Sequence, residues 1–356
     1  MIRIFYATRA NLCLRRAHTH NILKTVELLE CHNDTHITLV VSGRQSCAVE
    51  EMIDRHGVAK PFVFARARWL PWFLARRRTS FDMLYVRDPR LIFSMIAARL
   101  LGKKVIFEIH GSREWPLLYW LWKLAFRIAH AHVFITYALQ KAYRPHKKPH
   151  AVIPCVGVDL AAFAAPPKPL RKEYNLSVDT SLLLYLGGSQ GIYYHVTLLV
   201  DMMEWLPKNA VLFLIGLKDR EAKIARARAE TLGIKNRVFC IARVNPPEIP
   251  SYLCAADVLL NPKVKGYAGS VSSKLYEYLA AGKPIVASLV PADREVISEQ
   301  NAFIVEPMAH AFARAVKQLY ENPEERKRLG ARARADAENY TWEERQRKLI
   351  EFIKNL

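Results

Sequence analysis

The stretch of sequence that decides the predicted fold lies at residues 272–288 and reads Ser272-Ser273-Lys274-Leu275-Tyr276-Glu277-Tyr278-Leu279-Ala280-Ala281-Gly282-Lys283-Pro284-Ile285-Val286-Ala287-Ser288. The pattern predicts a helix with both ends marked. A serine is expected to cap the first amides, and Gly282 followed by Pro284 is expected to end the helix after about two turns. The apolar run 285–287 predicts that a short buried strand follows at once.

The start of this predicted helix is a candidate anion site. Unpaired amides and the helix dipole both face a phosphate that approaches Ser272 and Ser273. Glu277 lies one turn further in, where a carboxylate suits the hydroxyls of a ribose better than a phosphate. A capped helix alone is common, so its meaning depends on the rest of the chain.

Length and composition limit the class of protein. With 356 residues and 51% hydrophobic composition, the chain can bury two cores, which predicts two domains. The six cysteines form no C-x-x-C motif and no cluster, so we expect reduced thiols in a cytoplasmic protein. The chain opens directly into a strand-like run rather than a signal peptide. No run of about 20 apolar residues lacks charge, so we expect no spanning helix.

The net charge of +20 is unevenly placed. Residues 1–165 hold 25 Lys and Arg against 11 Asp and Glu, whereas the rest hold 28 against 22. An anionic lipid surface, a nucleic acid or a phosphorylated acceptor would each explain a basic first half. A general basic bias without any specific partner is the remaining alternative.

Strand-like and helix-like segments alternate through both halves. In the first half, strands are expected at 2–7, 37–42, 83–86, 105–109 and 133–135, and helices at 20–29, 92–101 and 115–128. A proline-rich stretch at 161–172 is interpreted as a linker. In the second half, strands are expected at 181–186, 211–215, 238–240, 257–260, 284–287 and 302–305. Helices are expected at 197–206, 220–232, from 273 and over 311–356. Such alternation predicts parallel sheets covered by helices.

Several segments resemble one known family in the order in which that family carries them. Residues 152–159 with Phe163 look like its interdomain turn "viPnGvD…F", and 183–188 resemble its first donor-domain strand with a glycine loop. Residues 256–262 look like "aDv.l.P", and the tail from 301 to 342 resembles its closing helices. With the helix from Ser273, these segments resemble glycosyltransferase family 4, retaining enzymes of the GT-B fold that use nucleotide sugars.

The resemblance implies an α/β architecture of two Rossmann-like domains that face each other across a cleft. It places an acceptor-binding domain at 1–163 and a nucleotide-sugar-binding domain at 170–335. A last helix at 336–356 is expected to pack back toward the first domain. Fold likeness alone assigns no function, so the site residues must carry the assignment.

The family pattern places donor contacts along the second domain. Gly187 and Gly188 would let the backbone approach the diphosphate, and Arg243 would lie near the base. An ordinary tight turn and a solvated arginine are the alternatives. The family's first motif glutamate is replaced by Gly269, so the loop Gly269-Ser270-Val271, together with Ser272 and Ser273, is expected to hold the sugar through backbone amides.

The usual Arg and Lys after the glycine loop are also absent from residues 189–195. A departing diphosphate needs charge stabilisation. We expect Lys274, assisted by Lys263 or Lys265, to supply the positive charge that the missing Arg and Lys would provide. The alternative is that Lys274 is a solvated side chain. We therefore expect no cofactor and no metal ion. The pairs His18/His20 and His130/His132 have metal-like spacing but lack a third ligand.

On the acceptor side, Glu108-Ile109-His110-Gly111 resembles the family's "E-x-H-G". The resemblance implies that His110 bonds the donor sugar or the acceptor, while the departing phosphate oxygen takes the acceptor proton. Glu108 is expected to orient the loop. His110, Lys274 and Glu277 are thus the predicted catalytic residues.

Two segments suggest a membrane surface. Residues 66–78 bracket aromatic side chains with five arginines, which suits the boundary between headgroups and acyl chains. A loop whose tryptophans enter the core is the alternative. In the helix at 115–128, Trp115, Tyr119, Trp122 and Phe126 form a second apolar stripe, opposite the leucine stripe.

The sequence therefore predicts a cytoplasmic, peripheral-membrane, retaining glycosyltransferase. It would move a sugar from a nucleotide diphosphate to a lipid-linked or cell-envelope acceptor. One alternative is a glycosyltransferase acting on nucleic acid, but we find no element that would read a duplex and expect no nucleic acid partner. The other is a GT-B-like protein that binds nucleotide or lipid without turnover.

Overall fold

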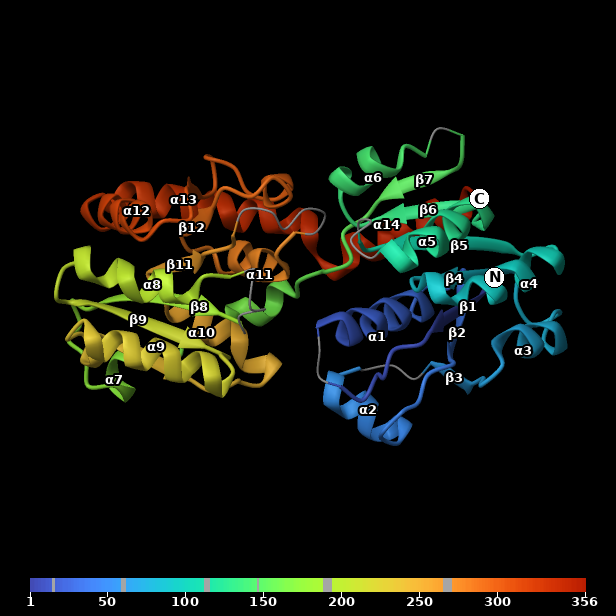
Figure 1. Ribbon diagram of the computed structural model, residues 1–356, viewed down its shortest axis with the longest axis horizontal. Helices are drawn as coiled ribbons and strands as arrows, with labels where there is room; N and C mark the ends of the chain where they lie inside the picture. Colours follow the sequence, from blue (N-terminus) through green and yellow to red (C-terminus); the bar gives the residue numbers. More distant parts are fainter. Residues whose placement is uncertain (15–16, 59–61, 112–115, 146, 188–193, 265–270) are drawn as a thin grey trace. The chain divides into compact units, whose positions relative to one another are not determined.

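The structure is a computed structural model that describes residues 1–14, 17–58, 62–111, 116–145, 147–187, 194–264 and 271–356. The chain forms two compact units (Figure 1). Unit 1 comprises Met1–Val156 together with Trp342–Leu356, and unit 2 comprises Gly157–Thr341. The boundaries expected from sequence, at 163 and 336, lie a few residues away.

Unit 1 is built on a seven-stranded parallel sheet in the order β3-β2-β1-β4-β5-β6-β7. Its strands are β1 (Ile2–Thr8), β2 (Thr35–Val41), β3 (Val63–Arg66), β4 (Met83–Val86), β5 (Lys104–Ile109), β6 (Ala131–Phe134) and β7 (His150–Val152). The central strands are nearly continuous apolar runs because helices cover both faces. The strand order reverses between β1 and β4, which is where ligands bind in sheets of this kind.

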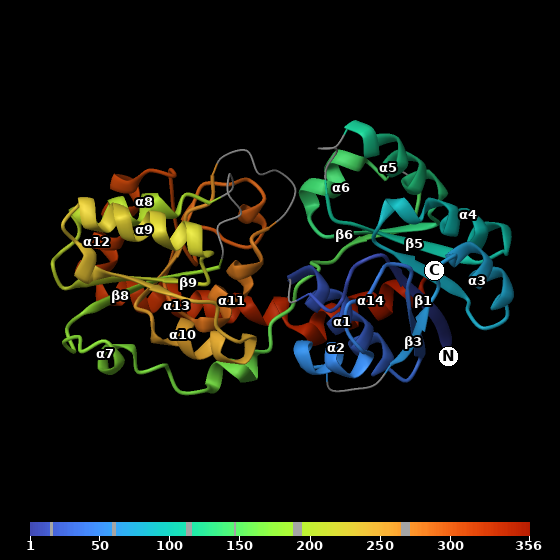
Figure 2. The same cartoon turned by 60° about the horizontal axis from the view of Figure 1, so that its bottom comes forward.

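Two helix layers enclose this sheet. α1 (Ala17–Glu30), α2 (Val49–His56) and α14 (Trp342–Lys354) pack on one face. α3 (Leu70–Arg76), α4 (Ile92–Leu100), α5 (Pro116–Ile128) and α6 (Tyr137–Tyr143) pack on the other face. Figure 2 shows α5, α4 and α3 following one another around one side, with α1 and α14 opposite. α14 supplies Leu349, Ile350 and Ile353 to the core of unit 1.

Unit 2 contains a six-stranded parallel sheet in the order β10-β9-β8-β11-β12-β13. Its strands are β8 (Ser181–Leu186), β9 (Ala210–Ile215), β10 (Val238–Ile241), β11 (Val258–Asn261), β12 (Ile285–Ser288) and β13 (Phe303–Val305). The short helix α7 (Leu170–Glu173) precedes β8. The strand order reverses between β8 and β11, so a ligand is expected at the carboxyl ends of these two strands.

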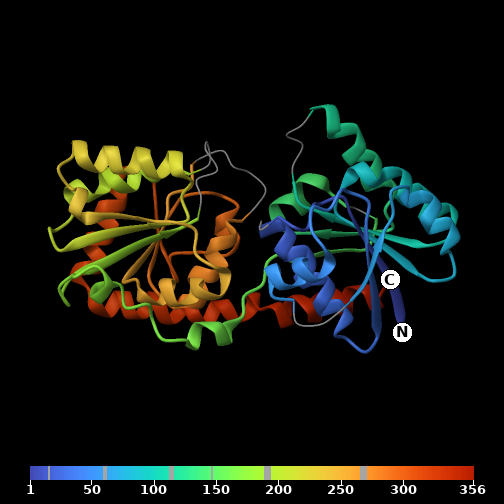
Figure 3. The same cartoon turned by 90° about the horizontal axis from the view of Figure 1, so that it is seen from below.

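Helices again form two layers around the sheet. α8 (Val196–Met202), α9 (Asp219–Thr231) and α12 (Ala309–Glu321) share one core cluster with alternate residues of β8 and β9. α10 (Ile249–Ala255), α11 (Ser273–Ala281) and α13 (Pro323–Ala337) follow one another in the second layer. Figure 3 shows the strands of unit 2 between α9 above and α13 below.

The predicted α/β fold with two parallel-sheet domains is confirmed. Within residues 272–288 the predicted helix end and the following strand are confirmed, because α11 ends at Gly282 with φ 64° and β12 follows. The segments missed by the sequence analysis include α2, β3, α3, α6, β7 and α7. Both missed strands are sheet edges with half-exposed residues, so they carry no buried apolar run.

The expectation that all six cysteines are free thiols is wrong. Cys13 and Cys47 form a disulfide across a sequence separation of 34 residues. Cys13 follows β1 and Cys47 follows β2, and the carboxyl ends of these adjacent parallel strands bring the two loops together. Cys31, Cys155, Cys240 and Cys254 are free. Spacing alone could not reveal a pair that depends on strand order.

None of the helices in the described part of the chain has the length and apolar character needed to cross a membrane.

Candidate functional site

The candidate site of unit 2 is built at the end of β8. Gly187 follows this strand with φ +114° and donates its amide hydrogen to the carbonyl of Ile215 at 2.8 Å. A Cβ placed on Gly187 would lie 3.3 Å from the Nζ atom of Lys274. Gly216, at the end of β9, also has a positive φ, and its own Cβ position lies 3.7 Å from the Cα of Gly187. Two glycines therefore let the backbones of β8 and β9 and a lysine meet at one point.

Lys274 is a buried side chain in the first turn of α11, which excludes the solvated alternative. Its Nζ donates to the hydroxyl of Tyr185 at 2.9 Å. The same atom lies 4.0 Å from the ring centre of Tyr185 and 3.9 Å from that of Tyr194. Burial lowers the pKa of Lys274 to about 7, although the negative charges of Asp293 and Glu277 oppose the shift. The result is a desolvated cation that an anionic ligand would hold in its protonated form.

The expected side-chain cap at the start of α11 is wrong. Within the described residues, the Ser272 hydroxyl makes no bond to the first helix amides. It bonds instead with the Tyr194 hydroxyl, at 2.5 Å, and with Asn261. The amide of Ser272 donates to Asp293 at 2.9 Å. The Ser272 side chain therefore does not cap α11, and among the first amides that of Leu275 donates to the Ser272 carbonyl at 3.0 Å.

Lys263 has a different role from Lys274. Its ammonium pairs with Asp293 at 2.8 Å, and both side chains are fully buried. Burial lowers the pKa of Lys263, while Asp293 opposes the shift. Asp293 also accepts from Asn261 and from the amide of Ser272. Lys263 therefore helps to fix the approach to α11.

Glu277 lies one turn beyond Lys274 on the same helix and is half-buried. Desolvation raises its pKa to about 7, with Lys274 opposing the shift. Lys274 and Glu277 thus both titrate near neutral pH, and each favours the charged form of the other. Strongly shifted pKa values of this kind are concentrated at functional sites.

The other predicted donor residues are placed as follows. Ser273 is exposed at the start of α11, and Val271 is half-buried. Arg243 is exposed in the loop after β10, the edge strand beside β9. Gly188, Gly269, Ser270 and Lys265 lie outside the described residues.

The candidate residues of unit 1 form a buried polar network around Glu108. This carboxylate is fully buried on β5 and accepts from the Tyr85 hydroxyl, from His110 and, at 3.2 Å, from Arg345 of α14. Burial raises the pKa of Glu108, but the positive charges of Arg345 and Arg87 and the hydrogen bond from His110 outweigh it, so the pKa lies well below its usual value. Glu108 is therefore ionised, and its carboxylate links the side chains of Tyr85, His110 and Arg345.

His110 uses both ring nitrogens within this network. Arg87 donates from a guanidinium nitrogen 3.1 Å from Nδ1, so Nδ1 must accept. The ring proton therefore resides on Nε2, which donates to Glu108. Burial, reinforced by Arg87, lowers the pKa of His110 to about 4. In this arrangement His110 is neutral and its nitrogens are occupied, so it is poorly placed to abstract a proton.

The sequence analysis missed Arg87, Arg345, Tyr185, Tyr194 and Asp293. Arg87 directly follows β4, at the point where the strand order reverses, and this position was its only signal. Arg345 is separated from Glu108 by 237 residues, so no local pattern could connect them.

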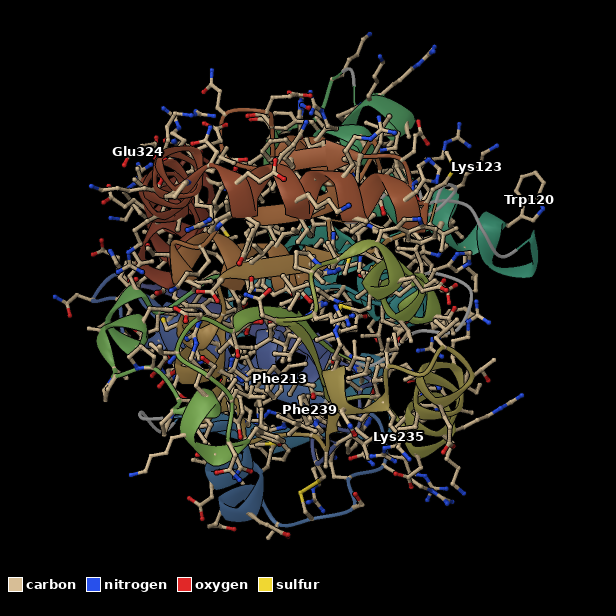
Figure 4. The ribbon with its side chains drawn as sticks, turned by 90° about the vertical axis from the view of Figure 1, so that its left-hand side faces the viewer. Trp120, Lys123, Phe213, Lys235, Phe239 and Glu324 are labelled. Carbon is tan, nitrogen blue, oxygen red and sulfur yellow. A yellow bond between two sulfur atoms is a disulfide. The ribbon has the colours of Figure 1, made fainter. Side chains whose placement is uncertain are left out.

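A separate cavity in unit 2 lies away from this site. A cavity of about 440 Å³ is lined by residues that include Lys235 and Phe239, which Figure 4 labels. Its lining comes mainly from α9 and β10, and neither Gly187 nor Lys274 belongs to it. The described residues contain no group of three His, Cys, Asp or Glu side chains that could hold a metal ion.

Comparisons with known proteins identify similar sequences for unit 2 and similar folds for the chain. Residues 168–336 match the family described as "Glycosyl transferases group 1". The chain is 31% identical over 210 residues to D-inositol 3-phosphate glycosyltransferase of Xylanimonas cellulosilytica, covering 55% of this chain and 48% of the relative. It is 28% identical over 191 residues to a GDP-mannose-dependent alpha-(1-6)-phosphatidylinositol dimannoside mannosyltransferase of Mycobacterium tuberculosis, covering 53% and 48%. The chain thus spans about half the length of these relatives.

The structure also resembles HepE of Anabaena, crystallised in complex with UDP. The TM-score is 0.79 with 16% identity, and the likeness covers 100% of both chains. At this identity the likeness shows the fold alone, which is the GT-B fold of two Rossmann-like domains. We conclude that residues 168–336, within unit 2, match the Glycosyl transferases group 1 family and that the chain has the GT-B fold.

Proposed function

We propose that the protein is a retaining glycosyltransferase that moves a sugar from a nucleotide-diphosphate donor to a lipid-linked or cell-envelope acceptor. One observation carries the proposal. Gly187, Lys274 and the start of α11 lie together where the strand order of unit 2 reverses, between β8 and β11. The family match over residues 168–336 and relatives named as glycosyltransferases support it.

The donor diphosphate would lie over Gly187, where no side chain separates it from the backbone. Lys274 and the first amides of α11 would face the phosphate that leaves with the nucleotide. Glu277, one turn further along, would accept hydrogen bonds from the ribose hydroxyls. HepE was crystallised with UDP, which supports a nucleoside diphosphate as the probe to try first.

In the proposed reaction, the bond between the sugar and the diphosphate breaks and the acceptor oxygen bonds to the same face of the sugar. The departing phosphate oxygen takes the proton from the acceptor hydroxyl. The neutral, fully engaged His110 supports this choice of base, because Arg87 and Glu108 occupy its nitrogens. His110 would instead present its ring edge and the adjacent Gly111 to the substrate.

We propose that no metal ion is needed, since Lys274 and the helix amides supply the positive charge. A chelator should then leave transfer unchanged, whereas loss of activity that added magnesium restores would overturn this part.

The proposed location is the inner face of the cytoplasmic membrane. The Cys13–Cys47 disulfide of the structure is rare in reducing compartments, so the redox state of this pair in cells tests the proposed location. Alkylation of cell extracts followed by mass spectrometry measures this: two blocked thiols support the location, and a bridged pair contradicts it.

The proposal is tested in two steps. UDP, GDP, ADP and their sugar conjugates are first screened for a rise in the unfolding midpoint, because a ligand that binds only the native state stabilises it. Transfer with the best donor is then followed by NMR of the anomeric proton. Retained configuration is the expected result. Inverted configuration would contradict the retaining assignment, and binding without turnover would identify a non-catalytic protein.

A further inference from the structure

The outer surface of α3, α4 and α5 in unit 1 is unusual in composition. We call these helices and their flanking residues 66–69 and 77–78 the α3–α5 layer. α4 lies between α3 and α5, and it contacts both. The inner faces fill the core with residues such as Leu74, Met95 and Ala125.

Large apolar side chains nevertheless remain on the outside of all three helices. On α3 and its first flank, Trp69 is 75% and Trp72 is 55% exposed. On α4, Phe93 is 73% and Leu100 is 83% exposed. On α5, Trp120 is 72% exposed, and Figure 4 shows it projecting outward beside Lys123. The alternative that these loop tryptophans enter the core is therefore wrong, because Leu70 and Leu74 take that place.

The exposed residues follow helical periodicity. On α4, Phe93, Ile96, Ala97 and Leu100 form one outward stripe, which is apolar throughout. On α5, the outward stripe is Trp120, Lys123, Leu124 and Arg127. The aromatic stripe expected on this helix does not face outward, since Trp122 packs on Phe107 and Phe126 stacks on His132. Trp115 and the side chain of Tyr119 lie outside the described part of the chain.

The charge of the layer has one sign. Residues 62–81, 89–107 and 116–145 contain no Asp or Glu, whereas 66–78 alone contain five arginines. Arg76 lies over the ring of Trp72 at 4.0 Å from its centre. The opposite layer differs, because its exposed Arg347 on α14 is paired with Glu344 and Glu351. An ordinary solvated surface in this protein interleaves its charges, and the α3–α5 layer does not.

We propose that the α3–α5 layer is a docking surface for an anionic lipid bilayer. The arginines would lie among the headgroups, while Trp69, Trp72, Phe93, Leu100 and Trp120 would enter the boundary with the acyl chains. This inference extends the proposed function to its acceptor side, although it rests on unit 1 alone.

A bilayer fits this surface better than a nucleic acid does. A phosphate backbone would satisfy the arginines, but it offers no apolar volume for the stripe from Phe93 to Leu100. Stacking on bases would use the tryptophans and leave Leu100 exposed. A bilayer interface accommodates both classes of side chain at once.

The first experiment measures co-sedimentation of the full chain with vesicles of pure phosphatidylcholine or of phosphatidylcholine with phosphatidylglycerol. The variant R76S/R77S/R78S is compared with K223S/K317S/K327S, which removes three exposed charges from unit 2. We expect the first variant to lose about 100-fold in partitioning onto the anionic vesicles at low salt, since each cation near an anionic leaflet contributes to binding. The control should bind like the wild type. Equal binding by all three proteins would overturn the proposal.

The second experiment tests the apolar part with F93S/W120S against V178S/W205S, a pair of exposed apolar residues in unit 2. We expect F93S/W120S to lose at least 10-fold in binding at 0.5 M salt, where charge is screened and apolar insertion dominates. Brominated lipid should likewise quench tryptophan fluorescence less in F93S/W120S than in V178S/W205S.

Undiminished binding or quenching in F93S/W120S would overturn the bilayer assignment. Binding to duplex DNA that exceeds binding to anionic vesicles would overturn it in favour of nucleic acid. No donor or acceptor is present in these assays, so their outcome is separate from that of the transfer assay.

Discussion

The ammonium of Lys274 donates to the hydroxyl of Tyr185 at 2.9 Å, directly beside the backbone of Gly187. This places a cation under the glycine turn that ends β8, shielded from water by two tyrosine rings. A buried ammonium destabilises the ligand-free protein because it has lost its hydration. A bound anion therefore stabilises this ammonium more than it would stabilise a solvated one.

Lys274→Met should stabilise the ligand-free protein near pH 6 and impair transfer. With a pKa lowered to about 7, native Lys274 releases a proton that the unfolded chain retains up to about pH 10.5. The free energy of unfolding of the wild type should therefore rise between pH 7 and 10.5, and the variant should lack that rise. The difference at pH 6 is about 2–4 kcal/mol.

Transfer turnover of Lys274→Met should fall at least about 100-fold, because charge on the departing phosphate is no longer neutralised. Thermal unfolding at several pH values and steady-state kinetics provide the two measurements, with Lys317→Met on the exposed face of α12 as the control. Normal turnover in Lys274→Met would remove this residue from the reaction.

Gly187→Ala should weaken donor binding more than it harms folding. The methyl group would lie 3.3 Å from Lys274 Nζ, and φ +114° strains any L side chain. We expect a loss of about 1–3 kcal/mol in stability. Gly233→Ala is the matched control, because Gly233 also has a positive φ but an added Cβ there would meet no atom within 4 Å. If both variants bind the nucleotide equally well, Gly187 does not border the donor.

Glu277→Gln should raise stability near pH 8 and lower the affinity for the donor. Its folded pKa of about 7 exceeds the usual 4.5, so the wild type loses stability as the pH rises from about 4.5 through 7. The neutral amide removes this dependence. A hydrogen bond to a charged group contributes about 1.5–3 kcal/mol, so nucleotide affinity should fall about 10–100-fold by calorimetry. Unchanged affinity would show that Glu277 does not touch the ribose.

Arg345→Met should destabilise unit 1 strongly. It would leave the buried carboxylate of Glu108 without one of its cations, and breaking a buried pair costs about 3–5 kcal/mol. Arg347→Met, on the exposed side of the same helix, should cost less than about 1 kcal/mol. Urea unfolding of both variants distinguishes the cases, and equal stability would mean that the Glu108 network contributes little.

The sequence predicted those helices and strands whose position depends on neighbouring residues in the chain. The end of α11 at Gly282 and the full length of β8 were readable, because a left-handed glycine and a continuous apolar run are local signals. The edge strands β3 and β7 were not, because half-exposed strands lack such a run.

In the candidate site, too, some residues could be predicted from local patterns and others could not. Lys274, Glu277 and Gly187 could be named from one helix and one turn. The tyrosine pair around Lys274 and the pairing of Lys263 with Asp293 depend on which strands become neighbours. Cys13 and Cys47 were misjudged for the same reason.

The membership of α14 in unit 1 has a consequence for biosynthesis. Residues 157–341 are made between the two parts of unit 1, and they form a sheet and core of their own. Domains usually fold as units while the chain is being synthesised, with the first domain folding first. Here the order is reversed. Unit 1 cannot be completed before unit 2 has been made, because Glu108 lacks its Arg345 partner and the α1 face lacks Ile350 until α14 has been added. The half of the protein that begins synthesis is therefore the last to mature, and during that interval it is the half most exposed to chaperones and proteases.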